Sequence, residues 1–303
     1  MTNKVTVLGS LNVDTILQIT RLPKPGETMQ MHNKQNAGGG KGANQAISAA
    51  RSGAQTSFVG KIGADENGQM MKRLLAESMV DISQVTISEK DTGQAFILLQ
   101  DSGENSILVY GGANHTITDD DVYQAKEQIQ AADFLIAQFE TPIEQTITAF
   151  NLAKQAQVTT ILNPAPAKEA SAQLFSLVDL ITPNETEAEL LTGIHVTDEE
   201  SQHQAACKLQ EMGVKNVIIT LGSKGAFYRC GQTEGFVKAF KVDAVDTTAA
   251  GDTFLGALAS QLQPDFSNIK EAILYANKAS SLAVQKLGAI PSIPTYQQVK
   301  DQL

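Results

Sequence analysis

The chain has 303 residues, of which 42% are hydrophobic and 18% are charged, a composition typical of a folded globular protein and not of a disordered one. Its formal net charge of -10 argues against a nucleic-acid-binding protein, because such a surface needs clustered lysine and arginine. Cys207 and Cys230 lack the spacing of a zinc site or a disulfide scaffold, and no apolar run could span a bilayer, so we expect a cytoplasmic protein without a membrane partner.

The first third of the chain contains two stretches of short strands. Residues 4–9 predict a first, mostly buried strand, and the alternating segment from about 15 to 35 predicts strands around a turn rich in proline and glycine. Residues 94–100 and 106–110, joined by a turn, repeat this pattern. We expect these insertions, about 15–38 and 93–112, to form a small antiparallel sheet that acts as a lid.

The remaining segments alternate between strand and helix. The predicted strands are 57–62, 134–138, 159–162, 178–182 and 216–221, and the predicted helices are 67–79, 143–156, 201–212 and most of the chain after 246. Repeated strand–helix–strand units predict a parallel sheet with helices on both faces. We therefore expect one doubly wound α/β domain over residues 1–303, with its ligand site beyond the carboxyl ends of the strands.

Residues 9–14, Gly-Ser-Leu-Asn-Val-Asp, follow the first predicted strand. Asn12 and Asp14 are two residues apart, so in extended backbone they lie on one face, where an amide and a carboxylate can bind neighbouring sugar hydroxyls. The alternative is a turn in which both side chains bond to their own backbone. This motif alone favours the turn.

A glycine-rich segment, residues 37–46, leads directly into an apolar helix that ends near Gly53. Its glycines let the backbone approach a ligand closely, and Lys41 and Asn44 supply hydrogen-bond donors. Residues 38–43 formally match a dinucleotide-binding fingerprint, but that fingerprint should follow a buried strand and residues 32–36 are polar. The pattern favours a loop for a small ligand over a flexible linker.

Residues 245–254, Val-Asp-Thr-Thr-Ala-Ala-Gly-Asp-Thr-Phe, open a second apolar helix. The amides of Ala250, Gly251 and Asp252 would point toward an anion at the helix N-terminus, where the helix dipole favours negative charge. An aspartate near a helix start is also common as a simple cap. The two acids that bracket Thr-Thr-Ala-Ala-Gly favour the anion site.

Segments 39–46 and 246–254 together resemble the paired signature of the ribokinase family of carbohydrate kinases, and residues 9–14 resemble the opening motif of its ribose-specific members. The likeness covers nearly the whole chain. It implies transfer of a phosphoryl group from ATP to the 5-hydroxyl of ribose. Deoxyribose, fructose or a nucleoside are alternative acceptors. A non-catalytic sugar-binding regulator is less favoured because Gly251 and Asp252 are intact, and a dinucleotide-dependent oxidoreductase is a distant third.

The resemblance also implies individual roles. Asp252 is the expected catalytic base, assisted by the amides of Gly251 and Ala250. The residues expected around the sugar are Asn12, Asp14, Gly40, Lys41, Gly42, Asn44, Glu140 and Asp252. Those expected around the nucleotide are Asn184, Thr220, Gly222, Ser223, Lys224, Gly225, Gly251 and Asn277.

The implied cofactors are Mg²⁺ and a K⁺ activator, and two lids are expected to pair in a homodimer. Glu187 would hold Mg²⁺ through water, and the residues at the matching K⁺ positions are Asp246, Thr248, Ala283, Lys286, Gly288 and Ser292. Without the resemblance, Glu140 is an isolated surface acid and residues 185–189 are an acidic first helical turn. Residues 220–225 are equally consistent with a hairpin turn.

Overall fold

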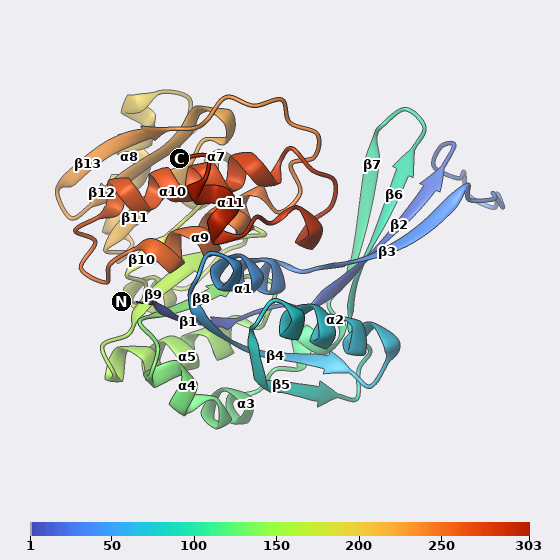
Figure 1. The fold of residues 1–303 in the computed structure, drawn as a ribbon, viewed down its shortest axis with the longest axis horizontal. Coiled ribbons are helices and arrows are strands. Elements are labelled where there is room, and N and C mark those ends of the chain that lie inside the picture. The colour runs from blue at the N-terminus through green and yellow to red at the C-terminus, as the bar shows by residue number, and fades with distance from the viewer. Residues whose placement is uncertain (1) are drawn as a thin grey trace.

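The computed structural model describes residues 2–303 and contains two β-sheets of different size (Figure 1). The larger sheet has nine strands in the order β13-β12-β11-β10-β9-β8-β1-β4-β5. Their bounds in chain order are β1 Lys4–Leu8, β4 Gln55–Gly63, β5 Asp81–Ser88, β8 Phe134–Gln138, β9 Thr159–Asn163, β10 Leu180–Ile181, β11 Asn216–Thr220, β12 Gly225–Cys230 and β13 Thr233–Lys238. The strands from β5 to β11 pair in parallel, and only β12 and β13 are added antiparallel. The predicted fold class is confirmed.

Alternating side chains divide the core between the two faces of this sheet. In β1, Val5 and Val7 enter one apolar cluster while Leu8 enters the other. Neighbouring residues of β8 are likewise sent to opposite clusters, and nearly all are fully buried. Because both faces are covered, the central strands are apolar throughout, as expected for parallel strands between helical layers.

Helices cover both faces of the large sheet. One layer consists of α1 Lys41–Arg51, α2 Glu66–Glu77, α9 Ala250–Gln261, α10 Ile269–Ala283 and α11 Tyr296–Lys300. The other consists of α3 Asp119–Gln124, α4 Lys126–Gln130, α5 Ile143–Gln155, α6 Ala172–Ser176, α7 Glu185–Thr192 and α8 Glu199–Glu211. Within residues 2–303, no helix combines the length and the apolar character that a membrane span requires.

The small sheet projects from one end of the main body (Figure 1). It has four strands in the order β3-β2-β6-β7, with bounds β2 Asn12–Ile19, β3 Asn33–Gly39, β6 Gly93–Gln100 and β7 Asn105–Tyr110. The β2–β3 and β6–β7 pairs are antiparallel hairpins, whereas β2 and β6 pair in parallel. This parallel pair follows from the main sheet, because β1 and β5 run in the same direction and lead into β2 and β6.

Several elements differ from the sequence expectation. The strand expected at 178–182 contains only Leu180–Ile181. The edge strand β5 was not predicted, and its burial explains why: only Val85 of its eight residues is fully buried, so no apolar run marks it. The strands β12 and β13 were not predicted either, and residues 220–225 therefore lie both at a strand end and in the turn of a hairpin.

Candidate active site

The N-termini of α1 and α9 lie together because these two helices pack unusually closely. A Cβ atom on Gly256 would lie 2.3 Å from the backbone oxygen of Gln45, so only glycine permits this approach. On the same contact, the hydroxyl of Ser48 donates to the backbone oxygen of Thr253 at 2.7 Å. The packing brings the two glycine-containing motifs, residues 39–46 and 246–254, together, although they are about two hundred positions apart in the sequence.

Asp252, in the first turn of α9, is only 8% exposed and accepts hydrogen bonds from both neighbouring amide side chains of α1. Asn44 Nδ2 donates to Oδ2 at 3.0 Å, and Gln45 Nε2 donates to Oδ1 at 2.8 Å. These bonds fix the plane of the carboxylate. The side-chain oxygen of Asn44 is buried and accepts no hydrogen bond from any residue in the range 2–303, which leaves one acceptor beside Asp252 without a partner.

Gln45 is a site residue that the sequence-based interpretation did not single out. It is fully buried, and its Oε1 accepts a hydrogen bond from Gln138 Nε2 at 2.7 Å. Its Nε2 also donates to Asn163 Oδ1 at 3.2 Å. Hydrogen bonds to β8 and β9 therefore fix the side-chain amide that binds Asp252. The available signal was a large polar side chain among the mostly small and apolar buried residues of α1.

The N-terminus of α9 offers two free backbone amides. Ala249 precedes the helix with a positive φ of 59°, and no side chain caps it. The amide of Ala250 donates to the oxygen of Thr247 at 3.2 Å, so it is already engaged. The amides of Gly251 and Asp252 have no acceptor among residues 2–303. A negative group placed there would receive two hydrogen bonds and the favourable end of the helix dipole.

Asn12 and Asp14 lie at the start of β2, where it crosses from the main body into the small sheet, so the turn favoured from the motif alone is wrong. Asn12 is 5% exposed and its Oδ1 accepts from Asn114 Nδ2 at 2.8 Å. A Cβ atom on Gly39 would lie 2.3 Å from Asp14 Oδ2, so the carboxylate lies directly on the glycine-rich segment. This close approach explains why glycine is needed there.

Glu140 is not an isolated surface acid. Its Oε2 accepts a hydrogen bond from the amide of Lys41 at 3.0 Å and another from the hydroxyl of Ser10. The Ser10 hydroxyl in turn accepts from the amide of Gly42 at 3.2 Å. Gly40, with φ of 90°, provides no side chain to cap α1, and Glu140 takes over that role from a different strand end. Ser10 is the second residue that was not predicted.

The carboxylates and Lys41 share one electrostatic environment. Burial, followed by repulsion from Glu140 and Asp252, raises the pKa of Asp14 to about 6. Burial alone would lower the pKa of Lys41, but attraction to Asp252, Glu140 and Glu187 outweighs it and raises the pKa overall. Burial raises the pKa of Glu187 as well, against the opposing effects of the Asn184 amide and Lys41. The cleft therefore brings together the expected sugar residues and the N-terminus of α7.

The expected nucleotide residues lie at neighbouring strand ends. Asn184 and Glu187 form a reciprocal capping box on α7, with bonds of 2.8 and 3.0 Å between backbone and side chain. The amide of Thr220 donates to the oxygen of Pro183 at 2.9 Å, which joins this cap to the end of β11. The exposed 3-10 turn Gly222–Lys224 follows directly. Both the acidic-turn and the hairpin interpretations are thus correct as descriptions of local structure.

Gly225 and Asn277 fasten this region to the rest of the fold. Gly225 has φ of 128°, and a Cβ atom there would lie 2.1 Å from the oxygen of Val237. Asn277 Nδ2, on α10, donates to the oxygens of Val237 and Lys238 at 3.1 and 3.2 Å. In the described structure the side chain of Asn277 therefore holds the end of β13, a structural role that leaves Oδ1 for other partners.

The segment before α9 and the segment after α10 meet around Asp246. Its Oδ1 accepts from the amide and hydroxyl of Thr248, at 2.9 and 2.6 Å, and its Oδ2 accepts from the amide of Gly288 at 2.8 Å. Ala283 and Lys286 are joined by a backbone hydrogen bond, and Ser292 is fully buried in the 3-10 turn Ile290–Ser292. Residues 2–303 contain no group of three histidine, cysteine or acidic side chains able to hold a metal.

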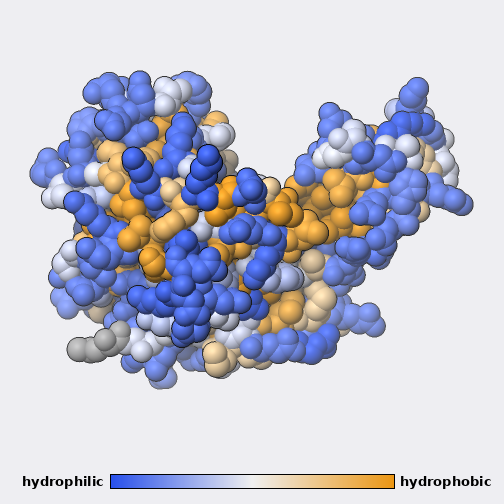
Figure 2. All heavy atoms as spheres, turned by 45° about the horizontal axis from the view of Figure 1, so that its top comes forward, coloured by the Kyte–Doolittle hydropathy of each residue, from blue (hydrophilic) through white to orange (hydrophobic). Residues whose placement is uncertain are grey.

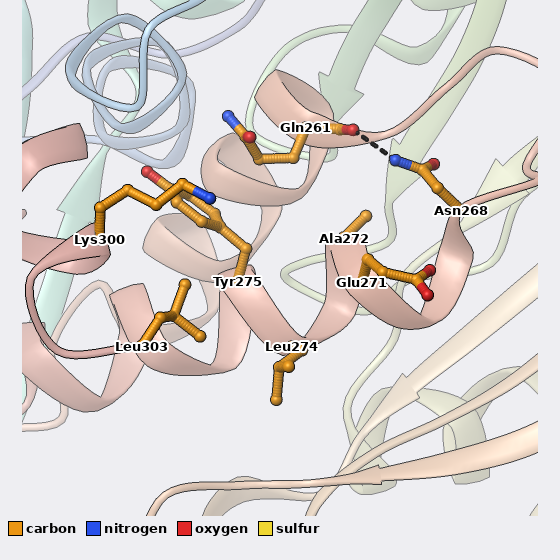
Figure 3. A pocket seen from close by; sticks show the side chains of 8 residues that line it. All are labelled: Gln261, Asn268, Glu271, Ala272, Leu274, Tyr275, Lys300 and Leu303. Atoms are coloured by element: carbon orange, nitrogen blue, oxygen red, sulfur yellow. Dashed lines mark hydrogen bonds between the residues drawn. The ribbon is translucent and has the colours of Figure 1, made fainter.

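A depression on the opposite side of the helical layer does not belong to this site. It is lined by Gln261, Asn268, Glu271, Ala272, Leu274, Tyr275, Lys300 and Leu303 (Figure 3). Gln261 ends α9, whereas Asp252 is near its start, so the two are about 14 Å apart along the helix axis. Hydrogen-bonded acids and unpaired backbone amides meet instead at Asp252.

Comparison with known proteins gives matches along the chain. Residues 2–296 match the model of the pfkB family carbohydrate kinases. The chain is 50% identical to a ribokinase of Staphylococcus aureus and 44% identical to one of Haemophilus influenzae, and each alignment covers 99% or more of both chains. The solved structure of Arabidopsis thaliana ribokinase complexed with ribose and ATP superposes with a TM-score of 0.92, at 35% identity over 99% of this chain and 98% of the other.

The raised pKa of Asp14 predicts a pH-dependent effect on stability. The folded chain binds this proton up to about pH 6, whereas an unfolded aspartate releases it near 3.8, so stability falls as the pH rises from about 4 to 6. With some solvent screening, the loss is about 1–3 kcal/mol. We expect Asp14→Asn to become more stable than the original chain at pH 7 and to lose that advantage at pH 4. Urea unfolding at both pH values measures the difference, and an identical pH dependence of the two proteins would contradict it.

Proposed function

The chain belongs to the pfkB family of carbohydrate kinases, and we propose that it transfers the γ-phosphoryl group of ATP to the 5-hydroxyl of D-ribose, producing ribose 5-phosphate and ADP. The observation that carries the proposal is the carboxylate of Asp252, held by two amides beside two free backbone N–H groups. Relatives named ribokinase align over the whole chain, which favours ribose over fructose, deoxyribose or a nucleoside.

Asp252 acts as the general base in this proposal. Its carboxylate accepts the proton of the sugar hydroxyl as that oxygen attacks the γ-phosphorus, and the bond to the leaving oxygen of ADP breaks. The amides of Asn44 and Gln45 orient the carboxylate without protonating it. Asn12, Asp14 and the free oxygen of Asn44 supply acceptors for the sugar hydroxyls, and Lys41, Gly40, Gly42 and Glu140 complete the enclosure.

Charge stabilisation comes from the N-terminus of α9 and from Lys41. The amides of Gly251 and Asp252 would donate to the transferred phosphoryl group, and this kind of preorganised donor contributes most of the barrier reduction in phosphoryl transfer. Ala250, whose amide is bonded within the turn, supports the helix start. The nucleotide phosphates would lie near Asn184, Thr220 and the turn that ends at Gly225, and the base near Asn277.

Asp252→Asn should lower kcat at least about 100-fold, because an amide cannot accept the proton. The test is a coupled ADP-release assay with ribose, deoxyribose, fructose and a nucleoside, in which ribose should give the highest kcat/KM. Asp243→Asn, an exposed acid three residues before Asp246, is the matched control and should keep full activity. A near-normal rate for the Asp252 variant would contradict the role of Asp252 as the base. If none of the acceptors supported ADP release, the kinase assignment would be overturned.

We also infer that the protein binds two cations, Mg²⁺ and K⁺. Mg²⁺ keeps several waters and binds through few carboxylates, so Glu187 at the N-terminus of α7 could hold it through water without a cluster of acidic ligands. When bound with ATP it would neutralise phosphate charge. K⁺ would bind beside the start of α9, where Asp246, Thr248, Ala283, Lys286, Gly288 and Ser292 supply mainly backbone oxygens. The hydrogen bonds of Asp246 across this loop support such a site.

Activity should therefore require Mg²⁺ and rise when Na⁺ is replaced by K⁺. Asp246→Asn should abolish most of the K⁺ response while keeping the Mg²⁺ requirement, because it weakens the loop and removes a negative charge. Initial rates at constant ionic strength, with the two monovalent ions exchanged, measure the effect. Equal rates in both salts would contradict the K⁺ site, and activity in the presence of excess chelator would contradict the Mg²⁺ site.

We further propose that residues 1–303 form one cytoplasmic catalytic domain whose small sheet is a lid, and that two lids pair in a homodimer. The edge strand β7 supports this proposal, since Ile107, Leu108 and Val109 are 53–66% exposed. Figure 2 shows apolar residues along the projecting sheet and at its junction with the main body. An uncovered apolar edge strand is a liability that pairing removes.

Leu108→Lys should shift the dimer toward monomer, because it places a charge on the proposed contact. Leu190→Lys is the matched control, since Leu190 is similarly exposed, at 67%, but lies on α7 in the main body. Analytical ultracentrifugation over a range of concentrations gives the dissociation constants. A dimer equally stable in both variants would place the contact elsewhere.

A further inference from the structure

A cysteine, a histidine and a glutamate form a hydrogen-bonded chain on the surface of the opposite helical layer. His203 and Cys207 are one turn apart on α8, so they share one face of the helix. His203 Nε2 lies 3.4 Å from the sulfur of Cys207, and its Nδ1 lies 2.8 Å from Glu234 Oε2 on β13. None of the three has a role in the proposed kinase reaction.

The contacts determine the direction of the hydrogen bonds. An ionised carboxylate can only accept, so Nδ1 of His203 carries the proton that is donated to Glu234. In the neutral ring Nε2 is then the acceptor, and the thiol of Cys207 donates to it. The hydrogen bond from His203 lowers the pKa of Glu234, with a further contribution from Arg229, so this carboxylate stays ionised at neutral pH.

The surroundings leave the thiol and its histidine partner partly open to solvent. Cys207 is partly exposed, and the side chains of His203 and Glu234 are 40% and 37% exposed. The charged neighbours are Arg229 on β12, which also donates to Glu234 Oε2, and Lys208 on α8, which pairs with Glu211 at 3.1 Å. Each of these cations is matched by a carboxylate, so the feature that favours reaction at Cys207 is the hydrogen bond to His203 together with partial exposure.

From this geometry we propose that Cys207 is a thiol-modification site whose base is His203, positioned by Glu234, and that its reaction partner is a low-molecular-weight disulfide. The thiol proton passes to Nε2 of His203, and the sulfur attacks one sulfur of the reagent. A new disulfide forms as the reagent's own bond breaks. The leaving thiolate takes the proton from His203, so the cysteine is oxidised and half of the reagent is reduced to a thiol.

The second cysteine provides an internal control. Burial raises the pKa of Cys230 to about 12, so its thiol is almost never ionised. An ordinary cysteine is ionised to about 3% at pH 7, so a base that takes the thiol proton during the attack can speed the reaction considerably. Arg229, which donates to Glu234, is the register partner of Val217 in β11, three residues before Thr220. The cluster of Cys207, His203 and Glu234 is therefore about 10 Å along the strand from the nucleotide end of the cleft.

The test uses oxidised glutathione and, separately, iodoacetamide, with the modified cysteine identified by peptide mass spectrometry. At pH 7 Cys207 should react first and Cys230 should remain free. His203→Gln should slow Cys207 about tenfold at pH 7 and much less near pH 9, where the thiol ionises unaided. Glu234→Gln should have a smaller effect in the same direction. His195→Gln is the matched control, because His195 also pairs with a glutamate, at 2.7 Å, but lies in the loop between α7 and α8.

The kinase reaction of each variant should be unchanged, which shows that the fold is intact. If a variant fails to fold, the original chain still decides the question by comparison of Cys207 in the native protein with the same cysteine in urea. Faster reaction in the native state supports the proposal. An equal or slower native rate, preferential reaction of Cys230, or a His203→Gln rate equal to that of the His195 control would overturn it.

Discussion

The contact between the carboxylate of Asp252 and the amides of Asn44 and Gln45 organises the whole cleft. It joins the starts of two helices that belong to distant parts of the chain, and it leaves a buried carboxyl group oriented beside two unused backbone amides. Buried charge is costly unless it is hydrogen-bonded, so the two amides are what allow an acid at 8% exposure. The close packing at Gly256 and the hydrogen bond from the sheet to Gln45 keep that contact in place.

The balance of charge around Asp252 is the physical reason for the cations in the proposed mechanism. Glu140, Asp252 and Glu187 all interact with the ammonium of Lys41, and Asp14 is repelled by Glu140 and Asp252. A polyphosphate approaching such a cleft would be repelled without further positive charge. Helix N-termini contribute fixed partial charges, but these act only over the first turn. The same acids add to the effect of burial in raising the pKa of Asp14.

The sequence predicted the alternating β/α architecture and the importance of both glycine-rich helix starts, because these depend on periodicity and on local chemistry. It did not predict Ser10 or Gln45, whose roles depend on which strand end meets which helix. Glu140 was identified only through resemblance, because capping a helix from a distant strand has no local signature. The strands β5 and β13 were missed because edge strands are partly exposed and lack an apolar run. Distances, burial and the engagement of the Ala250 amide required three-dimensional information.

The small sheet is continuous with the binding residues. The strand β2 begins at Asn12 and carries Asp14, and β3 ends in Gly39, directly before the start of α1. No spacer separates the projecting strands from these groups, so a change in the orientation of the sheet necessarily displaces them. A partner that binds the sheet in one orientation therefore changes the affinity for the sugar. Thermodynamic reciprocity requires that the sugar changes the affinity for that partner by the same factor. The projecting sheet is therefore also an input through which a neighbouring surface can tune the occupancy of the cleft.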